Sequence, residues 1–174
     1  MKKILYLDMD GTLFDLHYQM IHVLGYSEDH YTDDILFVRD IYGIEYDKGL
    51  FRCLRELPIM YYFAKNEDRI REHYDEVKFL TYIGNHNKLQ VVVDDKKFCL
   101  NNSGLQASDM LIVEGSKLNK QYFARPGAVL LDDCQQTVDA FNSVDGAKAF
   151  KVDPFNREIT KESESEFLRQ LGIK

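Results

Sequence analysis

Two carboxylates stand two positions apart near the start of the chain, in the run Asp8-Met9-Asp10-Gly11-Thr12-Leu13. The run follows residues 3–7, a short apolar stretch with the length of a buried strand. The i, i+2 spacing points both carboxylates the same way while the strand geometry lasts, and Gly11 permits a sharp turn after them. Such a pair can hold a divalent cation through hard oxygen ligands, and one acid is then placed to attack a bound phosphate. An acidic turn at a strand end is the plainer alternative.

Composition limits the classes of function. The chain has 174 residues, which suits one compact domain with room for an insertion, and its hydrophobic content of 45% is enough for a core. A net charge of −7 argues against a broad basic face for duplex nucleic acid. A small anionic substrate fits better, because a metal ion and one or two cationic side chains can reverse the electrostatic field locally.

The cysteines and the hydropathy pattern bear on the compartment. Cys53, Cys99 and Cys134 are odd in number, widely spaced and form no metal-binding motif, so we expect reduced core thiols. No apolar run approaches the length of a membrane span, and we expect no signal peptide because the first strand starts almost at residue 1. These features predict a cytoplasmic protein.

Strands and helices alternate along the chain. Apolar runs predict four further strands, at residues 77–81, 109–113, 128–131 and 147–152. Helices are expected at residues 59–74, 88–100, 117–124, 135–142 and 160–171. Val91-Val92-Val93 also favours a strand, but a helix fits the alternating order. The pattern predicts an α/β fold with a doubly wound, mostly parallel sheet.

Roughly sixty residues separate the first strand from the second, far more than an ordinary connection needs. Helical spacing predicts helices at residues 16–24, 33–42 and 48–57 within this region. We therefore expect an α/β core of residues 1–15 and 57–174 with a small helical cap at 16–56. The aromatic rings of the cap either fill its own core or form a lid that closes on an apolar part of a substrate.

Acids and a hydroxyl fall at the predicted carboxyl ends of three strands: Asp8 and Asp10, Thr81, and Asp132 and Asp133. In doubly wound sheets ligands gather at this edge, near the switch in strand order. The coincidence predicts an active site there. Asp132-Asp133 also suits an N-cap for the following helix, a role that does not exclude metal binding.

The run D-x-D-G-T-L after an N-terminal strand resembles the first motif of the haloacid-dehalogenase-like (HAD-like) phosphotransferase superfamily. Thr81 resembles the second motif, whose hydroxyl holds a phosphate oxygen. Lys120, ahead of residues 125–133 (RPGAVLLDD), resembles the third and fourth motifs together. The resemblance implies a Rossmann-type HAD-like fold and spans nearly the whole chain.

The resemblance also implies roles for these residues. Asp8 would be the nucleophile that forms an aspartyl-phosphate, and Asp10 would protonate the leaving oxygen and later deprotonate water. Mg²⁺ would bind Asp8, the Asp10 carbonyl and Asp133, with Asp132 beside them. Lys120 would hold Asp8 and the phosphate against their mutual repulsion.

One position departs from the superfamily pattern. Relatives often carry Asn or Asp four residues after the second acid of the fourth motif, where this chain has Thr137. The change removes no proposed ligand, but it weakens the expected support of the metal site.

A finer resemblance concerns the substrate. Residues 49–58, 79–81 and 122–133 look like the 5'(3')-deoxyribonucleotidase family of bacterial and phage type. It implies a Mg²⁺-dependent 5'-nucleotidase acting on nucleoside monophosphates. In addition to Thr81 and Lys120 at the phosphate, Phe14 and Phe51 would face the base and sugar.

Other readings stay open at this point. The same residues with another lid would serve a phosphatase of a different small phosphorylated metabolite. A non-catalytic, phosphate-responsive module resembling a receiver domain also uses strand-end acids, a Thr and a Lys, although receivers place their paired acids after the first strand and lack the long insertion. A degenerate family member kept for binding is a third reading, and the full set of acids argues against it. The aromatic content is compatible with a homodimer face, which the sequence does not locate.

Overall fold

A five-stranded parallel sheet organises the part of the chain that this computed structural model describes: residues 2–23, 25, 51–52, 54–83 and 89–174. The strand order is β3-β2-β1-β4-β5, and every pair is parallel. The strands are β1 (Ile4–Leu7), β2 (Glu76–Tyr82), β3 (Met110–Val113), β4 (Ala128–Asp132) and β5 (Lys148–Lys151). The predicted α/β class is confirmed.

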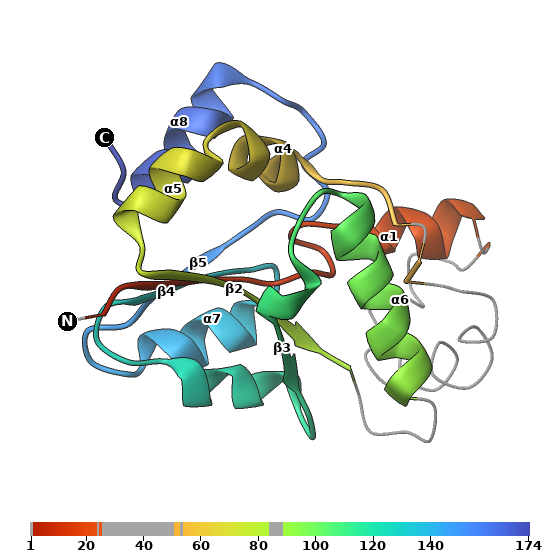
Figure 1. The fold of residues 1–174 in the computed structure, drawn as a ribbon, viewed down its shortest axis with the longest axis horizontal. Helices are drawn as coiled ribbons and strands as arrows, with labels where there is room; N and C mark the ends of the chain where they lie inside the picture. Colours follow the sequence, from red (N-terminus) through yellow and green to blue (C-terminus); the bar gives the residue numbers. More distant parts are fainter. Residues whose placement is uncertain (1, 24, 26–50, 53, 84–88) are drawn as a thin grey trace.

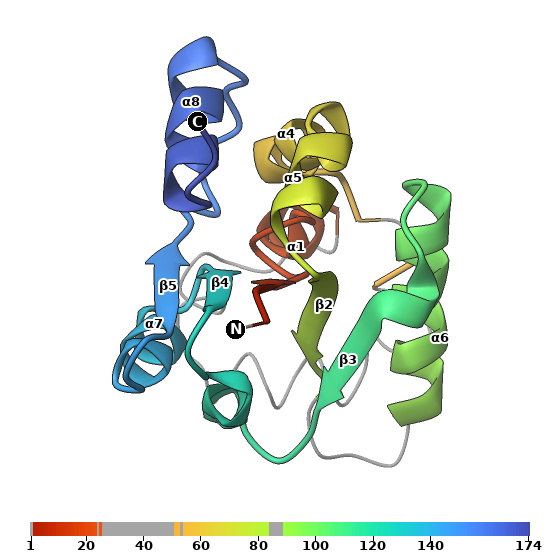
Figure 2. The same cartoon turned by 60° about the vertical axis from the view of Figure 1, so that its left-hand side comes forward.

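Helices cover both faces of the sheet (Figures 1 and 2). They are α1 (Leu16–Tyr18), the π-helix η1 (Gln19–Val23), α4 (Pro58–Lys65), α5 (Glu67–His73), α6 (Leu89–Asn102), the 3-10 helices η4 (Ala107–Asp109) and η5 (Lys117–Phe123), α7 (Gln135–Asn142) and α8 (Lys161–Gln170). Figure 1 shows α4, α5 and α8 above the sheet and α7 below it. The sheet is therefore doubly wound, as expected. None of the described helices has the length and apolarity that a membrane span requires.

Alternation along the central strand builds two separate cores. Leu5 and Leu7 of β1 pack into the cluster that also holds Phe63 of α4, whereas Ile4 and Tyr6 pack into the cluster with Phe141 of α7. All four β1 residues are buried because successive side chains of a strand point to opposite faces, and both faces are covered here.

The strand order fixes where a ligand can bind. β1 pairs with β2 on one side and with β4 on the other, so the chain reverses direction across the sheet after β3. The crevice between the carboxyl ends of β1 and β4 is the switch point at which such folds bind ligands. This 3-2-1-4-5 order is the Rossmann type and differs from the 2-1-3-4-5 order of flavodoxin and CheY, so the chain does not have the receiver-domain fold.

The predicted strands are confirmed within one or two residues, but the helix expected at 59–74 is wrong in one respect. It is two helices, α4 and α5, separated at Asn66, whose backbone (φ −116°, ψ 17°) leaves the helical region. The Asn66 side-chain amide donates to the carbonyl of Tyr62 (3.0 Å). An Asn side chain that bonds the local backbone competes with the helical hydrogen bonds, which explains the break.

The segment expected to be helical at 88–100 is helix α6, and the one expected at 117–124 is a 3-10 helix. The expected helix at 16–24 divides into α1 and a π-helical turn. The predicted helix at 33–42 lies outside the described residues. The described part of 48–57 is not helical, since Phe51 and Arg52 form a turn and Glu56 bridges to Phe14. The division into core and cap stays a prediction.

The prediction of reduced thiols in the core is confirmed for Cys99, whereas Cys134 is a free thiol outside the core. Cys99 is a buried free thiol in α6, and burial raises its pKa to about 12. Cys134 is free but only half-buried, at the N-cap of α7. Cys53 lies outside the described residues.

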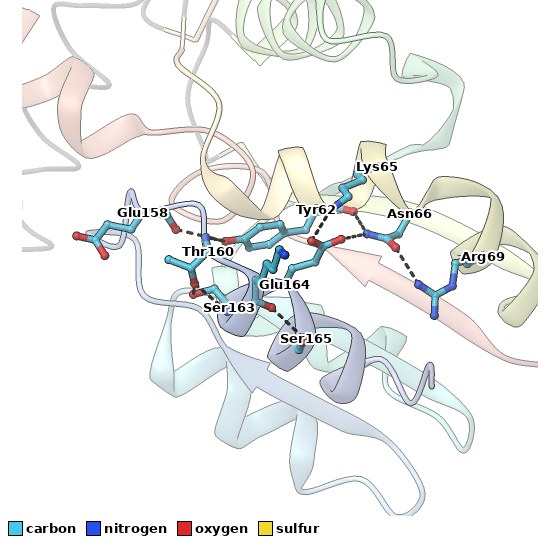
Figure 3. Close-up of polar contacts among 10 residues, drawn as sticks. Tyr62, Lys65, Asn66, Arg69, Glu158, Thr160, Ser163, Glu164 and Ser165 are labelled. Atoms are coloured by element: carbon cyan, nitrogen blue, oxygen red, sulfur yellow. Dashed lines mark hydrogen bonds and ion pairs between the residues drawn. The ribbon is translucent and has the colours of Figure 1, made fainter.

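A polar network fixes α8 against α4 (Figure 3). The Tyr62 hydroxyl accepts from the Thr160 N–H (3.1 Å) and donates to the Glu158 carbonyl (3.3 Å). Glu164 accepts from the Asn66 amide (2.8 Å) and pairs with the Lys65 ammonium (2.6 Å). The Tyr62 ring itself is buried, so its hydroxyl positions the chain at the start of α8 from within the core.

We predict that Tyr62→Phe lowers the free energy of unfolding by about 1–2 kcal/mol, because it leaves the Thr160 N–H and the Glu158 carbonyl without this partner. Urea unfolding would measure the change. The neighbouring Tyr61 is 46% exposed, so Tyr61→Phe is a matched control that we expect to be nearly neutral. Equal midpoints for the two variants would contradict the role of the Tyr62 hydroxyl.

Candidate active site

The loop after β1 holds the first two acids in place. Asp8 extends the pairing with β4, since its N–H donates to the Leu131 carbonyl (3.0 Å). The Met9 carbonyl then accepts from the N–H groups of Leu13 (3.0 Å) and Phe14 (2.9 Å), which closes a tight turn over residues 9–14. The acids therefore stand on a backbone that is tied both to the sheet and to itself.

Lys120 lies between two acids from neighbouring strands. Its ammonium is 2.7 Å from Asp8 Oδ1 and 2.7 Å from Asp132 Oδ2, and all three residues are buried. Burial alone would lower the pKa of Lys120, but the two carboxylates outweigh burial and raise it. η5, just before β4, thus supplies a permanent positive charge to the switch point.

Asp133 completes a group of acids. One carboxylate oxygen from each of Asp8, Asp132 and Asp133 lies within 4.8 Å of the others. Burial raises the pKa of both Asp132 and Asp133, and for Asp133 the negative charge of Asp8 adds to the effect. Three hard oxygen donors, two of them paired with the Lys120 ammonium, fit a divalent cation such as Mg²⁺, which would relieve their repulsion.

Gly11 allows Asp133 to approach the first loop. Its φ is +76°, a left-handed conformation, and a Cβ placed on it would lie 2.6 Å from Asp133 Cγ. Only glycine leaves room for the carboxylate at this point. The glycine of the first motif therefore has a steric role in addition to its turn.

Thr81 and Asp10 meet at a second lysine, which the sequence reasoning missed. Lys96 of α6 is 1% exposed, its ammonium forms a very short ion pair with Asp10 Oδ2, and it donates to Thr81 Oγ1 (3.0 Å). Burial raises the pKa of Asp10, and Lys96 opposes this shift. A sequence signal existed: Lys96 lies on the buried stripe of α6 that includes Val92 and Leu100.

The two aromatic residues predicted to face a substrate are both buried. Phe14 is fully enclosed in the core. Phe51 is 3% exposed, and the Lys96 ammonium lies 4.4 Å from its ring centroid. Packing in the core accounts for the burial of Phe14. Phe51 is linked to the acidic site by its contact with Lys96. Their contact with a substrate stays a prediction.

Thr137, the position at which the sequence departs from the superfamily pattern, lies on α7. It is fully buried, and its hydroxyl has no hydrogen-bond partner among the described residues. An unpartnered buried hydroxyl is unusual in a folded protein. It offers the acids of β4 none of the support that an Asn or Asp would give.

The comparisons with known proteins give a distant likeness. No protein-family model matches the chain, and no curated protein matches it in sequence. The HAD domain of the effector protein Lem4 from Legionella pneumophila aligns over 98% of this chain and 95% of its own, at 16% identity and a TM-score of 0.45. A predicted HAD-like family hydrolase from Porphyromonas gingivalis aligns over 97% and 98%, at 14% identity and a TM-score of 0.46. Likenesses this remote carry no argument, so the fold assignment rests on the observed sheet.

We predict that Gly11→Ala abolishes stabilisation by Mg²⁺, because the new methyl group displaces the Asp133 carboxylate from the acids. The measurement is the rise in Tm on adding Mg²⁺, which reports binding to the folded state. Gly104 is the control, since it has a similar φ of +78° but no atom within 4 Å of its Cβ position. Gly104→Ala should lose stability through backbone strain and keep the full Mg²⁺ response. A full response in Gly11→Ala would contradict the steric role.

Proposed function

We propose that this protein is a Mg²⁺-dependent phosphomonoesterase of the HAD-like superfamily that acts through an aspartyl-phosphate on Asp8. The observation that supports this most strongly is the ion-paired group at the switch point, where Lys120 joins Asp8 to Asp132 and Asp133 lies alongside. The first motif of the sequence and this group occupy the same sheet edge.

Asp8 is the nucleophile in this proposal. Its Oδ1 accepts from the Met9 N–H (2.8 Å) and from Lys120 (2.7 Å), which leaves Oδ2 for the attack. As the Oδ2–phosphorus bond forms, the bond from phosphorus to the leaving oxygen breaks. Asp10 donates its proton to that oxygen, and its Oδ1, which has no partner among the described residues, is the atom placed to carry the proton.

The second half of the reaction releases phosphate. Asp10 takes a proton from a water molecule, the resulting hydroxide oxygen attacks phosphorus, and the bond to Asp8 breaks. Thr81 donates a hydrogen bond to a phosphate oxygen, and Lys120 offsets the negative charge that gathers on Asp8 and the phosphoryl group. Each group is then returned to its starting state.

Asp8, Asp133 and the backbone carbonyl of Asp10 would hold the Mg²⁺ ion, with Asp132 beside them. When bound, the ion neutralises phosphate charge and fixes the phosphate against the nucleophile. The donor set of carboxylate and carbonyl oxygens is the one that Mg²⁺ prefers.

We propose nucleoside monophosphates, and deoxyribonucleotides in particular, as the substrate class. The support is the likeness of residues 49–58, 79–81 and 122–133 to the 5'(3')-deoxyribonucleotidase family. The position of Phe51 beside Lys96 agrees with an aromatic contact near the phosphate site. A phosphatase of another small metabolite would use the same acids, so only a comparison of substrates separates the two.

The test is phosphate release from dTMP, dUMP, AMP and simple sugar phosphates, with and without Mg²⁺. We expect Mg²⁺-dependent release, fastest from the deoxyribonucleotides, and a loss of roughly a thousandfold or more in kcat for Asp8→Asn, because the nucleophile is removed. Asp153→Asn is the control, since Asp153 follows β5 at the same sheet edge but is exposed.

Three results would each count against part of the proposal. Full activity in Asp8→Asn would rule out the covalent mechanism. A clear preference for sugar phosphates would retain the phosphatase and exclude the nucleotide part. Release that is independent of Mg²⁺ would remove the metal from the proposal.

A further inference from the structure

Lys96 is the residue of the site that the proposed reaction does not use. An ammonium that is 99% buried is costly unless it is paired and hydrogen-bonded, and here it has partners of both kinds. It projects from α6, whereas the other cation of the site comes from η5. A buried charge at this place calls for an explanation beyond packing.

The contacts of Lys96 occupy its donors. An ammonium has three N–H groups and no acceptor. One faces Asp10 Oδ2, one faces Thr81 Oγ1 at 3.0 Å, and the ammonium also lies over the Phe51 ring. Lys96 therefore has little left to offer a substrate directly.

The same contact determines the direction of the Thr81 hydroxyl. Since Lys96 can only donate, Thr81 Oγ1 must accept in this hydrogen bond, and its own O–H has to point elsewhere. Thr81 is fully buried at the carboxyl end of β2, where a buried O–H needs an acceptor. A phosphate oxygen at the switch point would supply it.

We propose that Lys96 is a positioning residue: by donating to Thr81 and Asp10, it turns the Thr81 O–H towards the phosphate group of the substrate and holds the Asp10 carboxylate beside it. This inference rests on the proposed phosphatase function. It adds a second cation, carried by α6, to the residues on which phosphate binding depends.

The test is a double-mutant cycle on the binding of inorganic phosphate, the reaction product, measured by calorimetry on the full chain with Mg²⁺. Lys96→Met keeps the length of the side chain and removes the ammonium, and Thr81→Val keeps the shape and removes the hydroxyl. We expect each variant to raise the Kd about tenfold or more, and the double variant to be no weaker than the weaker single variant. Lys97→Met, on the exposed face of α6, is the control and should bind as the native chain does.

Steady-state kinetics separates positioning from a merely structural role. Positioning predicts a higher KM together with a lower kcat in Lys96→Met. A loss of folded protein would lower the apparent kcat alone and leave KM and the phosphate Kd unchanged, which would overturn the proposal. Should Lys96→Met not fold because Asp10 is left unpaired, Asp10→Asn with Lys96→Met removes both charges, and its Kd should exceed that of Asp10→Asn about tenfold.

The remaining outcomes are also decisive. Unchanged phosphate binding in Lys96→Met, or losses that multiply in the double variant, would overturn the action through Thr81. A native chain that binds phosphate but hydrolyses no phosphomonoester would defeat the proposed function, and the cycle would still decide the role of Lys96 in phosphate binding. A native chain that hydrolyses phosphomonoesters but binds no phosphate would overturn the role of Lys96 and leave the proposed function standing.

Discussion

The Lys120 ammonium between Asp8 and Asp132 is the interaction on which the rest of the site depends. Buried carboxylates from adjacent strands repel one another; burial raises the pKa of Asp132, and the positive charge of Lys120 opposes that shift. Lys120 lies on η5, directly before β4, so the segment that delivers the cation also leads into the strand that carries Asp132. One short stretch of chain, from η5 to the end of β4, therefore places both Lys120 and Asp132.

The sheet order explains why these residues meet. Asp8 and Asp132 follow or end strands that are direct neighbours, with Leu7 paired to Leu131. The acids are far apart in sequence, but the switch in strand order makes β1 and β4 direct neighbours, with no other strand between their ends. Gly11 then permits Asp133 to lie against the first loop. The strand order thus places Asp8 and Asp132 at one edge of the sheet, and the lack of a side chain at Gly11 lets Asp133 approach them.

The sequence could predict what was local and could not predict what depended on a helix's rotation. Asp8, Thr81 and Asp132 stand at the ends of apolar runs, so strand prediction placed them on one edge. Lys96 and Lys97 are adjacent, and the phase of α6 puts the first inward and the second outward; the spacing of Lys96 from Val92 and Leu100 gives that phase only once the segment is taken as a helix. The break at Asn66 was equally hidden, since it follows from a side-chain hydrogen bond to the Tyr62 carbonyl that helical periodicity does not reveal.

Charge balance links the two lysines to the order in which ligands bind. Among the described residues, carboxylates outnumber ammonium groups at the site: Asp8, Asp10, Asp132 and Asp133 face Lys96 and Lys120. When all are ionised, the site has a net negative charge that repels a phosphate dianion. Burial makes that excess more costly, as the raised pKa of Asp133 shows. A divalent cation would cancel it, so the physical expectation is that the metal binds first and phosphate follows, with Lys96 and Lys120 flanking the anion.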